Sequence, residues 1–190
     1  ALWGSPSDVI LKTSGWWRPD LLVIGCHEFA HTDQSKMGSV SLEVVHQASC
    51  SVRVSRAGVS RTGPVLLIIG NDGSKEGQSL TQAVARRSWP ENTEAQVLSF
   101  VEPPGDHREQ GRERLNQAVE DSIQHLQRAG LTVRGSVVDG NPRQELVREA
   151  ERRNADTIFV GGSRESGRFL LGGISPAVVT KARCTVEVVR

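Results

Sequence analysis

The chain has 190 residues, of which 37% are hydrophobic and 24% are charged, and its formal net charge is +1. A net charge this small predicts neither nucleic acid nor an anionic membrane surface as a partner, because both select strongly basic proteins. The longest apolar runs, such as Val65–Ile69, are far shorter than the ~20 residues that cross a bilayer. We therefore expect a globular protein that binds neither nucleic acid nor membranes.

Three cysteines, Cys26, Cys50 and Cys184, are spread along the chain without a CxxC pair. An odd number of isolated cysteines argues against a disulfide framework and against a cysteine-based metal site. We expect buried, reduced thiols, which are typical of a cytoplasmic protein.

The N-terminal stretch 1–56 repeats the end of the chain. The matching stretches, which keep a nearly constant separation, are Pro19–Gly25 with Ala155–Gly161, Ala48–Val54 with Ala182–Val188, and Arg56 with Arg190. Their separation is the size of a domain, so it predicts a tandem duplication rather than a solenoid.

The repeat predicts three parts of the chain. Residues 1–56 are the C-terminal part of a first domain, 57–63 are a polar linker, and 64–190 are a complete second domain. Residue 1 aligns with residue 137, and the second copy begins near residue 57. We therefore expect the first copy to lack the part that is equivalent to 57–136, including its first strands.

Apolar runs and helical patterns alternate in the complete copy. The expected strands cover residues 64–70, 95–101, 131–138, 157–160 and 185–189. This order predicts an α/β fold with a doubly wound parallel sheet of five strands and helices on both faces. Ligands of such sheets bind beyond the carboxyl ends of the strands, where the strand order reverses. The candidate segments are Asn71–Ser74, after the first strand, and the glycine-rich loop 161–173, after the fourth.

Several motifs resemble those of the universal stress protein family. They are Asp72-Gly73-Ser74 at a strand end, Gly140-x-Pro142 at a helix start, Ala155-Asp156 before an apolar strand, and the closing Ala182-x-Cys184-x-Val186-x-Val188. They occur in order over 64–190, and the later ones occur again over 4–56. The resemblance implies five parallel strands of the adenine-nucleotide α-hydrolase-like type and dimerisation through the last strand. It also implies binding of ATP or a related adenine nucleotide, and a role in stress regulation.

In ATP-binding members of that family, a G-x2-G-x9-G-[ST] pattern wraps the phosphates, because glycine lets backbone N–H groups approach closely. In the second copy Gly161 and Gly172 match the outer glycines, but Arg164 replaces the middle one and the intervening loop is shorter. Asp72 matches the residue that holds the ribose, and Phe100 lies where the second strand meets the adenine. The expected cofactor site comprises Asp72, Ser74, Phe100, Gly161, Arg164, Gly172, Gly173 and Ser175.

The first copy keeps the spacing of this pattern as Gly25-x2-Glu28-x9-Gly38-Ser39. Glu28, however, places a carboxylate where phosphate oxygens would lie, and like charges ~4 Å apart repel by several kcal/mol at an effective dielectric of ~20. We therefore expect no nucleotide in the first copy.

The residues support a regulatory or binding protein better than an enzyme. Neither a Walker P-loop nor a Ser-His-Asp arrangement is recognisable, and only Asp72 and Glu165 are acidic candidates near the expected phosphates. The alternative is a nucleotide-hydrolysing or nucleotidyl-transferring enzyme of the same α/β superfamily, such as a weak ATPase.

Residues 27–31 spell HExxH, the zinc-protease signature. That chemistry requires both histidines on one face of a helix, but here the motif directly follows an expected strand. We expect no metal site.

Two further features concern association. Trp16-Trp17 stands on an expected helix where the second copy has Arg152-Arg153, so at least one tryptophan should be exposed or covered by a partner. Ser51–Val54 and Thr185–Val189 are each expected at a sheet edge, and edge strands invite pairing. We hypothesise that they mediate self-association or pair with each other within the chain.

Overall fold

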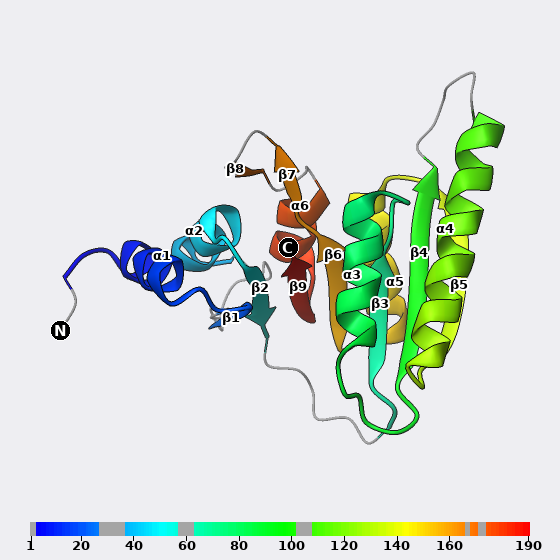
Figure 1. Cartoon of the computed structure of the whole chain (residues 1–190), viewed down its shortest axis with the longest axis horizontal. Helices are drawn as coiled ribbons and strands as arrows, with labels where there is room; N and C mark the ends of the chain where they lie inside the picture. Colours follow the sequence, from blue (N-terminus) through cyan, green and yellow to red (C-terminus); the bar gives the residue numbers. More distant parts are fainter. Residues whose placement is uncertain (1–2, 27–36, 57–62, 102–107, 166–167, 171–173) are drawn as a thin grey trace.

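The computed structural model describes residues 3–26, 37–56, 63–101, 108–165, 168–170 and 174–190. Its main sheet has seven strands in the order β1-β2-β9-β6-β3-β4-β5, and β7 and β8 form a separate hairpin. Figure 1 shows that the main sheet runs through both the N-terminal segment (residues 3–56) and the C-terminal segment (residues 63–190).

The C-terminal segment confirms the doubly wound α/β fold. Its elements are β3 (Leu66–Gly70), α3 (Lys75–Ala85), β4 (Glu94–Val101), α4 (Arg108–Arg128), β5 (Thr132–Asp139), α5 (Pro142–Arg153), β6 (Thr157–Gly161), α6 (Ile174–Lys181) and β9 (Thr185–Val189). The five strands β9-β6-β3-β4-β5 are all parallel. Helix α3 ends at Ala85, and the indole N–H of Trp89 in the segment that follows donates to the carbonyl of Val84 at 2.9 Å.

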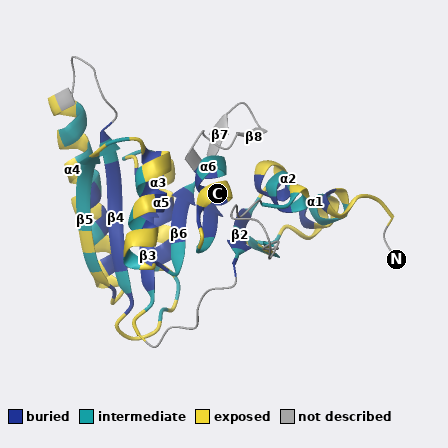
Figure 2. Cartoon of the chain, turned by 180° about the vertical axis from the view of Figure 1, so that it is seen from behind, coloured by how far each residue is buried: buried dark blue, intermediate teal, exposed yellow. Residues whose placement is uncertain are grey.

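Two cores lie on the two faces of this sheet. Strand residues alternate between them, so that Leu67 and Ile69 face α3 and α4 while Ile68 faces α5 and α6. Figure 2 shows β3, β4 and β6 as mostly buried strands. Burial on both faces explains why these strands are continuous apolar runs rather than alternating ones.

The N-terminal segment contains α1 (Pro6–Trp17), β1 (Leu21–Gly25), α2 (Ser39–Gln47) and β2 (Ser51–Ser55). These elements occupy the repeat positions of α5, β6, α6 and β9, and the equivalence extends to the helix ends. Ser5 and Asn141 each cap a helix start with a side-chain oxygen, and Arg18 (φ 52°) and Asn154 (φ 51°) each end a helix in the left-handed conformation. The sequence repeat is therefore also a repeat of local geometry.

The two segments meet between β2 and β9, which pair antiparallel, whereas β1 and β2 pair parallel. Val52 lies opposite Val188, Arg53 opposite Glu187, and Val54 opposite Val186. We call this contact between the segments the β2–β9 seam.

Two arginines form hydrogen bonds from one segment to the other at the ends of the β2–β9 seam. Arg56 donates from its guanidinium to the carbonyl oxygens of Cys184 (3.2 Å) and Val179 (2.5 Å). Arg190 donates in the same way to Cys50 (3.0 Å) and Val45 (2.5 Å), which are the repeat equivalents of those acceptors. Each segment thus caps the last turn of the other segment's final helix with a cation, where the helix dipole favours positive charge.

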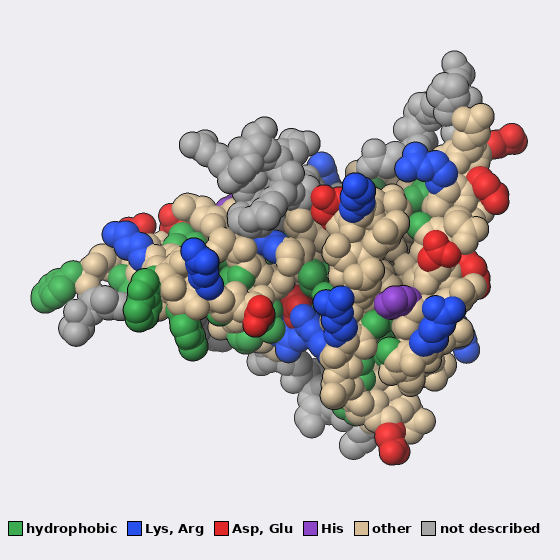
Figure 3. All heavy atoms as spheres, in the orientation of Figure 1, with side chains coloured by type: hydrophobic (Ala, Val, Ile, Leu, Met, Phe, Trp, Pro, Cys, Tyr) green, Lys and Arg blue, Asp and Glu red, His purple; other side chains and the backbone are tan. Residues whose placement is uncertain are grey.

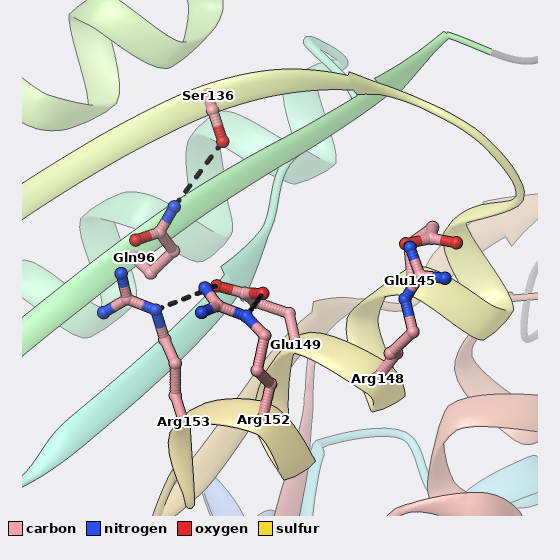
Figure 4. Close-up of polar contacts among 7 residues, drawn as sticks. All are labelled: Gln96, Ser136, Glu145, Arg148, Glu149, Arg152 and Arg153. Carbon is pink, nitrogen blue, oxygen red and sulfur yellow. Dashed lines mark hydrogen bonds and ion pairs between the residues drawn. The ribbon is translucent and has the colours of Figure 1, made fainter.

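Trp16 and Trp17, at the end of α1, are both exposed, at 86% and 73%. Figure 3 shows hydrophobic side chains gathered on the surface of the N-terminal segment. On α5 the equivalent arginines both pair with Glu149, and the hydrogen bond from Arg152 lowers the pKa of that carboxyl (Figure 4). The equivalent helix ends therefore differ: α1 ends in two exposed tryptophans, whereas α5 ends in two arginines that pair with Glu149.

The expectation of a glycine-rich loop over 161–173 is wrong in part. Strands β7 (Ser163–Glu165) and β8 (Arg168–Leu170) form an antiparallel hairpin. Strand β8 lies against α2 of the N-terminal segment.

Among the described residues, no helix is both long and apolar enough to span a membrane.

Candidate functional site

The strand order reverses between β3 and β6. From β3 the chain crosses to β4 on one side, whereas the strand that follows β6 in the main sheet is β9, on the other side. The connections that follow β3 and β6 therefore run in opposite directions. Ligands of this fold class bind beyond the carboxyl ends of two such strands. We call the carboxyl ends of β3 and β6 the carboxyl edge of the sheet.

Asn71 organises the end of β3. It is only 2% exposed, and its amide nitrogen donates to Ser122 on α4 at 2.8 Å while its amide oxygen accepts from the Gly73 N–H at 2.8 Å. Its backbone N–H donates to the Leu98 carbonyl of β4 at 2.9 Å. These bonds hold the turn in place, a role that the sequence pattern does not assign to Asn71.

Asp72 and Ser74 form a small network at the start of α3. The exposed Asp72 carboxylate accepts from the Ser74 N–H at 3.0 Å and from its hydroxyl at 2.5 Å. The Ser74 hydroxyl oxygen in turn accepts from the Gly77 N–H at 3.1 Å, which caps the helix. Gly73, at φ 74°, supplies the left-handed turn between them. The carboxylate is thus oriented and reachable from solvent.

Gly77 is required by this arrangement. A Cβ at that position would lie 2.2 Å from the Asn71 amide oxygen, far inside van der Waals contact. The signal for it in the sequence is a glycine in the first turn of a helix, where that residue is otherwise unfavourable.

Gly161 lies at the same edge, beside the first turn of α3. A Cβ placed on it would be 3.7 Å from the Cβ of Glu76. Its carbonyl accepts a 2.8 Å hydrogen bond from Ser175, which is 1% exposed. Ser41 makes the equivalent bond to Gly25 in the N-terminal segment, at 3.1 Å. In this structure the Ser175 hydroxyl ties the end of β6 to the start of α6.

The remaining predicted site residues either lie farther from the ends of β3 and β6 or fall outside the described residues. Phe100 lies half-buried on β4, one strand beyond β3, and packs against the core on the α5 side. Arg164 lies on β7, but its side chain is outside the described residues, as are Gly172 and Gly173. The structure thus brings Asp72, Ser74, Gly161 and Ser175 to one edge.

A cavity of about 320 Å³ adjoins this edge at the β2–β9 seam. Its lining residues are Ser49, Lys75, Glu76, Ser79, Gly162, Val189 and Arg190. The cavity includes Gly162 but neither Asp72 nor Phe100, so it lies beside the predicted residues rather than among them.

Burial alters the pKa values of groups along the seam. Desolvation raises the pKa of the Cys184 thiol to about 11, although the Arg56 guanidinium opposes the shift. Desolvation also raises the pKa of Cys50 and lowers the pKa of Arg190. All three cysteines are half-buried rather than fully buried, and none forms a disulfide.

The HExxH motif at 27–31 falls outside the described residues. Over the ranges that the structure describes, no group of three or more potential metal ligands comes together.

Comparison with known proteins identifies the family. The sequence model of the universal stress protein family matches residues 1–56 and 66–190. The chain belongs to the universal stress protein family. A curated member from Methanocaldococcus jannaschii is 35% identical over 63 residues, which are 32% of this chain and 37% of that protein. The matched stretch therefore spans well under half of that relative.

Solved structures of universal stress proteins share the fold. A putative universal stress protein from Pseudomonas aeruginosa superposes with a TM-score of 0.71 at 16% identity, covering 98% of this chain and 69% of that one. A universal stress protein solved in complex with cAMP gives 0.52 at 23% identity, covering 68% of this chain and 98% of the other.

Proposed function

We propose that this chain is a non-enzymatic regulatory protein that binds ATP or a related adenine nucleotide at the carboxyl edge of β3 and β6. The observation that carries this proposal is the Asp72 carboxylate, exposed and oriented by Ser74 at the start of α3. A fixed carboxylate accepts hydrogen bonds from a pair of ribose hydroxyls, as acidic residues do in other doubly wound nucleotide sites. The stress-related role follows from the family.

The other predicted residues have complementary roles in this proposal. Phe100 contacts the adenine from β4, and Gly161, Gly172 and Gly173 let the phosphates approach backbone N–H groups. Arg164 supplies positive charge in place of the missing glycine. Ser175 acts through Gly161, whose carbonyl it holds at 2.8 Å. The neighbour solved with cAMP supports adenine nucleotides as the ligand class.

We further propose that the N-terminal segment belongs to a tandem copy of the domain and has a structural role. The equivalent caps and the β2–β9 ladder support this arrangement. Glu28 argues against a nucleotide in that segment, because its carboxylate would repel phosphate. We place the protein in the cytoplasm, where adenine nucleotides are plentiful and thiols stay reduced.

Isothermal titration with ATP, with and without magnesium, tests the nucleotide site. We expect binding that weakens at least tenfold in Asp72→Ala, because a hydrogen bond to a charged group contributes about 1.5–3 kcal/mol. Asp121→Ala, which removes an exposed carboxylate on α4, serves as the matched control and should bind like the wild type.

Two outcomes would contradict the proposal. Failure to bind at millimolar nucleotide would leave an interaction module without a nucleotide. Steady release of ADP, lost in Asp72→Ala but kept in Asp121→Ala, would instead support the hydrolase alternative.

A further inference from the structure

We propose that the edge of β1 that faces away from β2 is a docking site for a strand followed by a helix. The occupant is a segment of the same kind as β3–α3: its strand pairs parallel to β1 beneath α1, and its helix covers the opposite face. This inference extends the structural role proposed for the N-terminal segment, and it does not depend on nucleotide binding.

The repeat shows which contacts β1 lacks. Strand β1 occupies the repeat position of β6, which has a neighbour on each side, β9 and β3. Strand β1 pairs with β2 alone and is an outer strand of the main sheet, among the residues that the structure describes. An unpaired edge invites another strand, and at the equivalent edge of β6 that strand is β3, which pairs parallel.

An acceptor for such a strand is already present at this edge. Asp156, which directly precedes β6, accepts a hydrogen bond from the backbone N–H of Leu66, the first residue of β3, at 2.7 Å. Its repeat equivalent, Asp20, directly precedes β1 and is exposed. A strand that enters in the register of β3 would therefore donate its first N–H to Asp20.

Helix α1 is placed to cover one face of an added strand. Its counterpart α5 contacts β3 and β4 as well as β6, and Leu146 and Val147 of α5 are buried in the core that β3 shares. The equivalent residues of α1, Ile10 and Leu11, are only half-buried. Figure 1 shows α1 at the outer end of the N-terminal segment. Helix α1 thus offers apolar surface to a strand beside β1.

The other face of β1 is uncovered as well. Val23 is exposed, whereas α3 covers its equivalent, Phe159. In the part of the chain that the structure describes, the large hydrophobic residues that are exposed all lie in the N-terminal segment: Trp3, Trp16, Trp17 and Val23. Apolar surface gathered in this way marks an interaction site. A helix that follows the added strand, as α3 follows β3, would cover Val23.

A second copy of β1 fits this edge poorly. Two β1 strands related by a two-fold axis would pair antiparallel and keep both α1 helices on one face of the joined sheet, as the β2–β9 seam keeps α2 and α6 on one face. Each α1 would then overlie the strand of the other copy, and helices about 10 Å wide cannot share the space above two strands ~4.8 Å apart.

A segment like β3–α3 avoids this conflict, because it brings its helix to the opposite face. The chain's own β3 and α3 are not available for docking, since they are packed in the C-terminal segment. The occupant is therefore a strand–helix segment from outside these 190 residues.

A synthetic peptide of residues 64–86, which contains β3 and α3, tests this inference on the full chain. We expect saturable 1:1 binding by isothermal titration and at least tenfold slower hydrogen exchange at the outward-facing β1 amides, because they gain hydrogen-bond partners. Asp20→Ala should weaken the binding at least tenfold, since it removes a charged acceptor. Asp121→Ala, which removes an exposed carboxylate on α4, is the matched control and should bind like the wild type.

Two further measurements distinguish strand pairing from non-specific adhesion. The peptide variant Leu67→Pro/Ile68→Pro lacks a backbone N–H toward each edge of its strand and should not protect β1. A chain that carries a further copy of residues 64–136 directly before residue 1, which aligns with residue 137, supplies the segment in the same polypeptide. That chain should show protected β1 amides without added peptide.

The inference is overturned if neither the peptide nor the extended chain slows exchange at β1. Equal peptide affinities of Asp20→Ala and the wild type would equally overturn it, as would a wild-type homodimer that pairs β1 with β1. The titration with ATP reports on the carboxyl edge of β3 and β6, so either proposal can fail while the other stands.

Discussion

Val23 and Phe159 occupy the same position of the repeat, yet Val23 is 60% exposed and Phe159 is fully buried. Phe159 lies beneath α3, where it meets the Trp89 ring edge-on at 6.0 Å between centroids. In the N-terminal segment, α1 and α2 pack on the opposite face of the sheet, against Leu22 and Ile24. Val23 is therefore exposed on its face of β1, whereas helix α3 covers the equivalent face of β6 that carries Phe159.

The first prediction compares these two positions. Phe159→Ala should lower the free energy of unfolding by about 3–5 kcal/mol, because it removes a buried aromatic ring and leaves a cavity. Val23→Ala should change it by no more than ~0.5 kcal/mol, since little apolar surface is lost from contact. Urea denaturation measures both, and similar losses would show that another molecule covers Val23.

A second prediction concerns the turn that orients Asp72. Gly77→Ala should destabilise the protein by about 2–4 kcal/mol, because its Cβ would lie 2.2 Å from the Asn71 amide oxygen and would break the network around it. Gly111→Ala is the matched control, since that helical glycine has open space around it. The control should stabilise the protein by about 0.5–1 kcal/mol through helix propensity alone. In thermal denaturation, the Tm of Gly77→Ala should therefore fall and the Tm of Gly111→Ala should rise, relative to the wild type.

The third prediction concerns Arg56 and Arg190, which form hydrogen bonds between the segments at the ends of the β2–β9 seam. Arg56→Met or Arg190→Met should cost about 2–4 kcal/mol of stability, because each leaves two carbonyl groups without their guanidinium donors. Arg183→Met removes a guanidinium that is 78% exposed and should have almost no effect. Chemical denaturation of the three variants makes the comparison, and equal midpoints would show that the seam does not depend on these bonds.

The fourth prediction is a loss of stability in alkali. The folded pKa of Cys184 is raised to about 11 from an ordinary value of 9.0, so the unfolded chain ionises first as the pH rises. The thiol's contribution is fully present below pH 9 and is lost by about pH 11, which amounts to about 2–3 kcal/mol at 1.36 kcal/mol per pKa unit.

Cys184→Ala should reduce the loss of stability between pH 9 and pH 11, and the raised pKa of Cys50 accounts for part of the slope that remains. Denaturation midpoints measured across this range decide the matter. A slope in Cys184→Ala that equals that of the wild type would assign the alkaline loss to other groups.

Much of the fold could be predicted because its signals are local. The five strands of the C-terminal segment follow from apolar runs, and the start of α5 follows from Gly140-x-Pro142, because these signals act over a few neighbours. The hairpin of β7 and β8 could not be predicted in this way, because a glycine-rich segment indicates a loop.

The candidate site could be predicted only in outline. Asp72 and Ser74 are recognisable because they follow a strand and begin a helix. The positioning role of Asn71 is not, because its partner, Ser122, lies 51 residues away on α4. The hydrogen bond from Ser175 to the Gly161 carbonyl could not be predicted either, since the sequence shows a hydroxyl but not its acceptor.

The sequence by itself provided the pattern that predicts a repeat, the family resemblance, the order of the elements and the start of α5. These depend on residue identity and short-range bonding, which repeat wherever the residues repeat. The tertiary structure alone decided that Arg53 meets Glu187, that Arg56 and Arg190 exchange carbonyl partners, and that Val23 is exposed where Phe159 is buried. These outcomes depend on register and packing between distant segments, so identical local patterns can end in opposite environments.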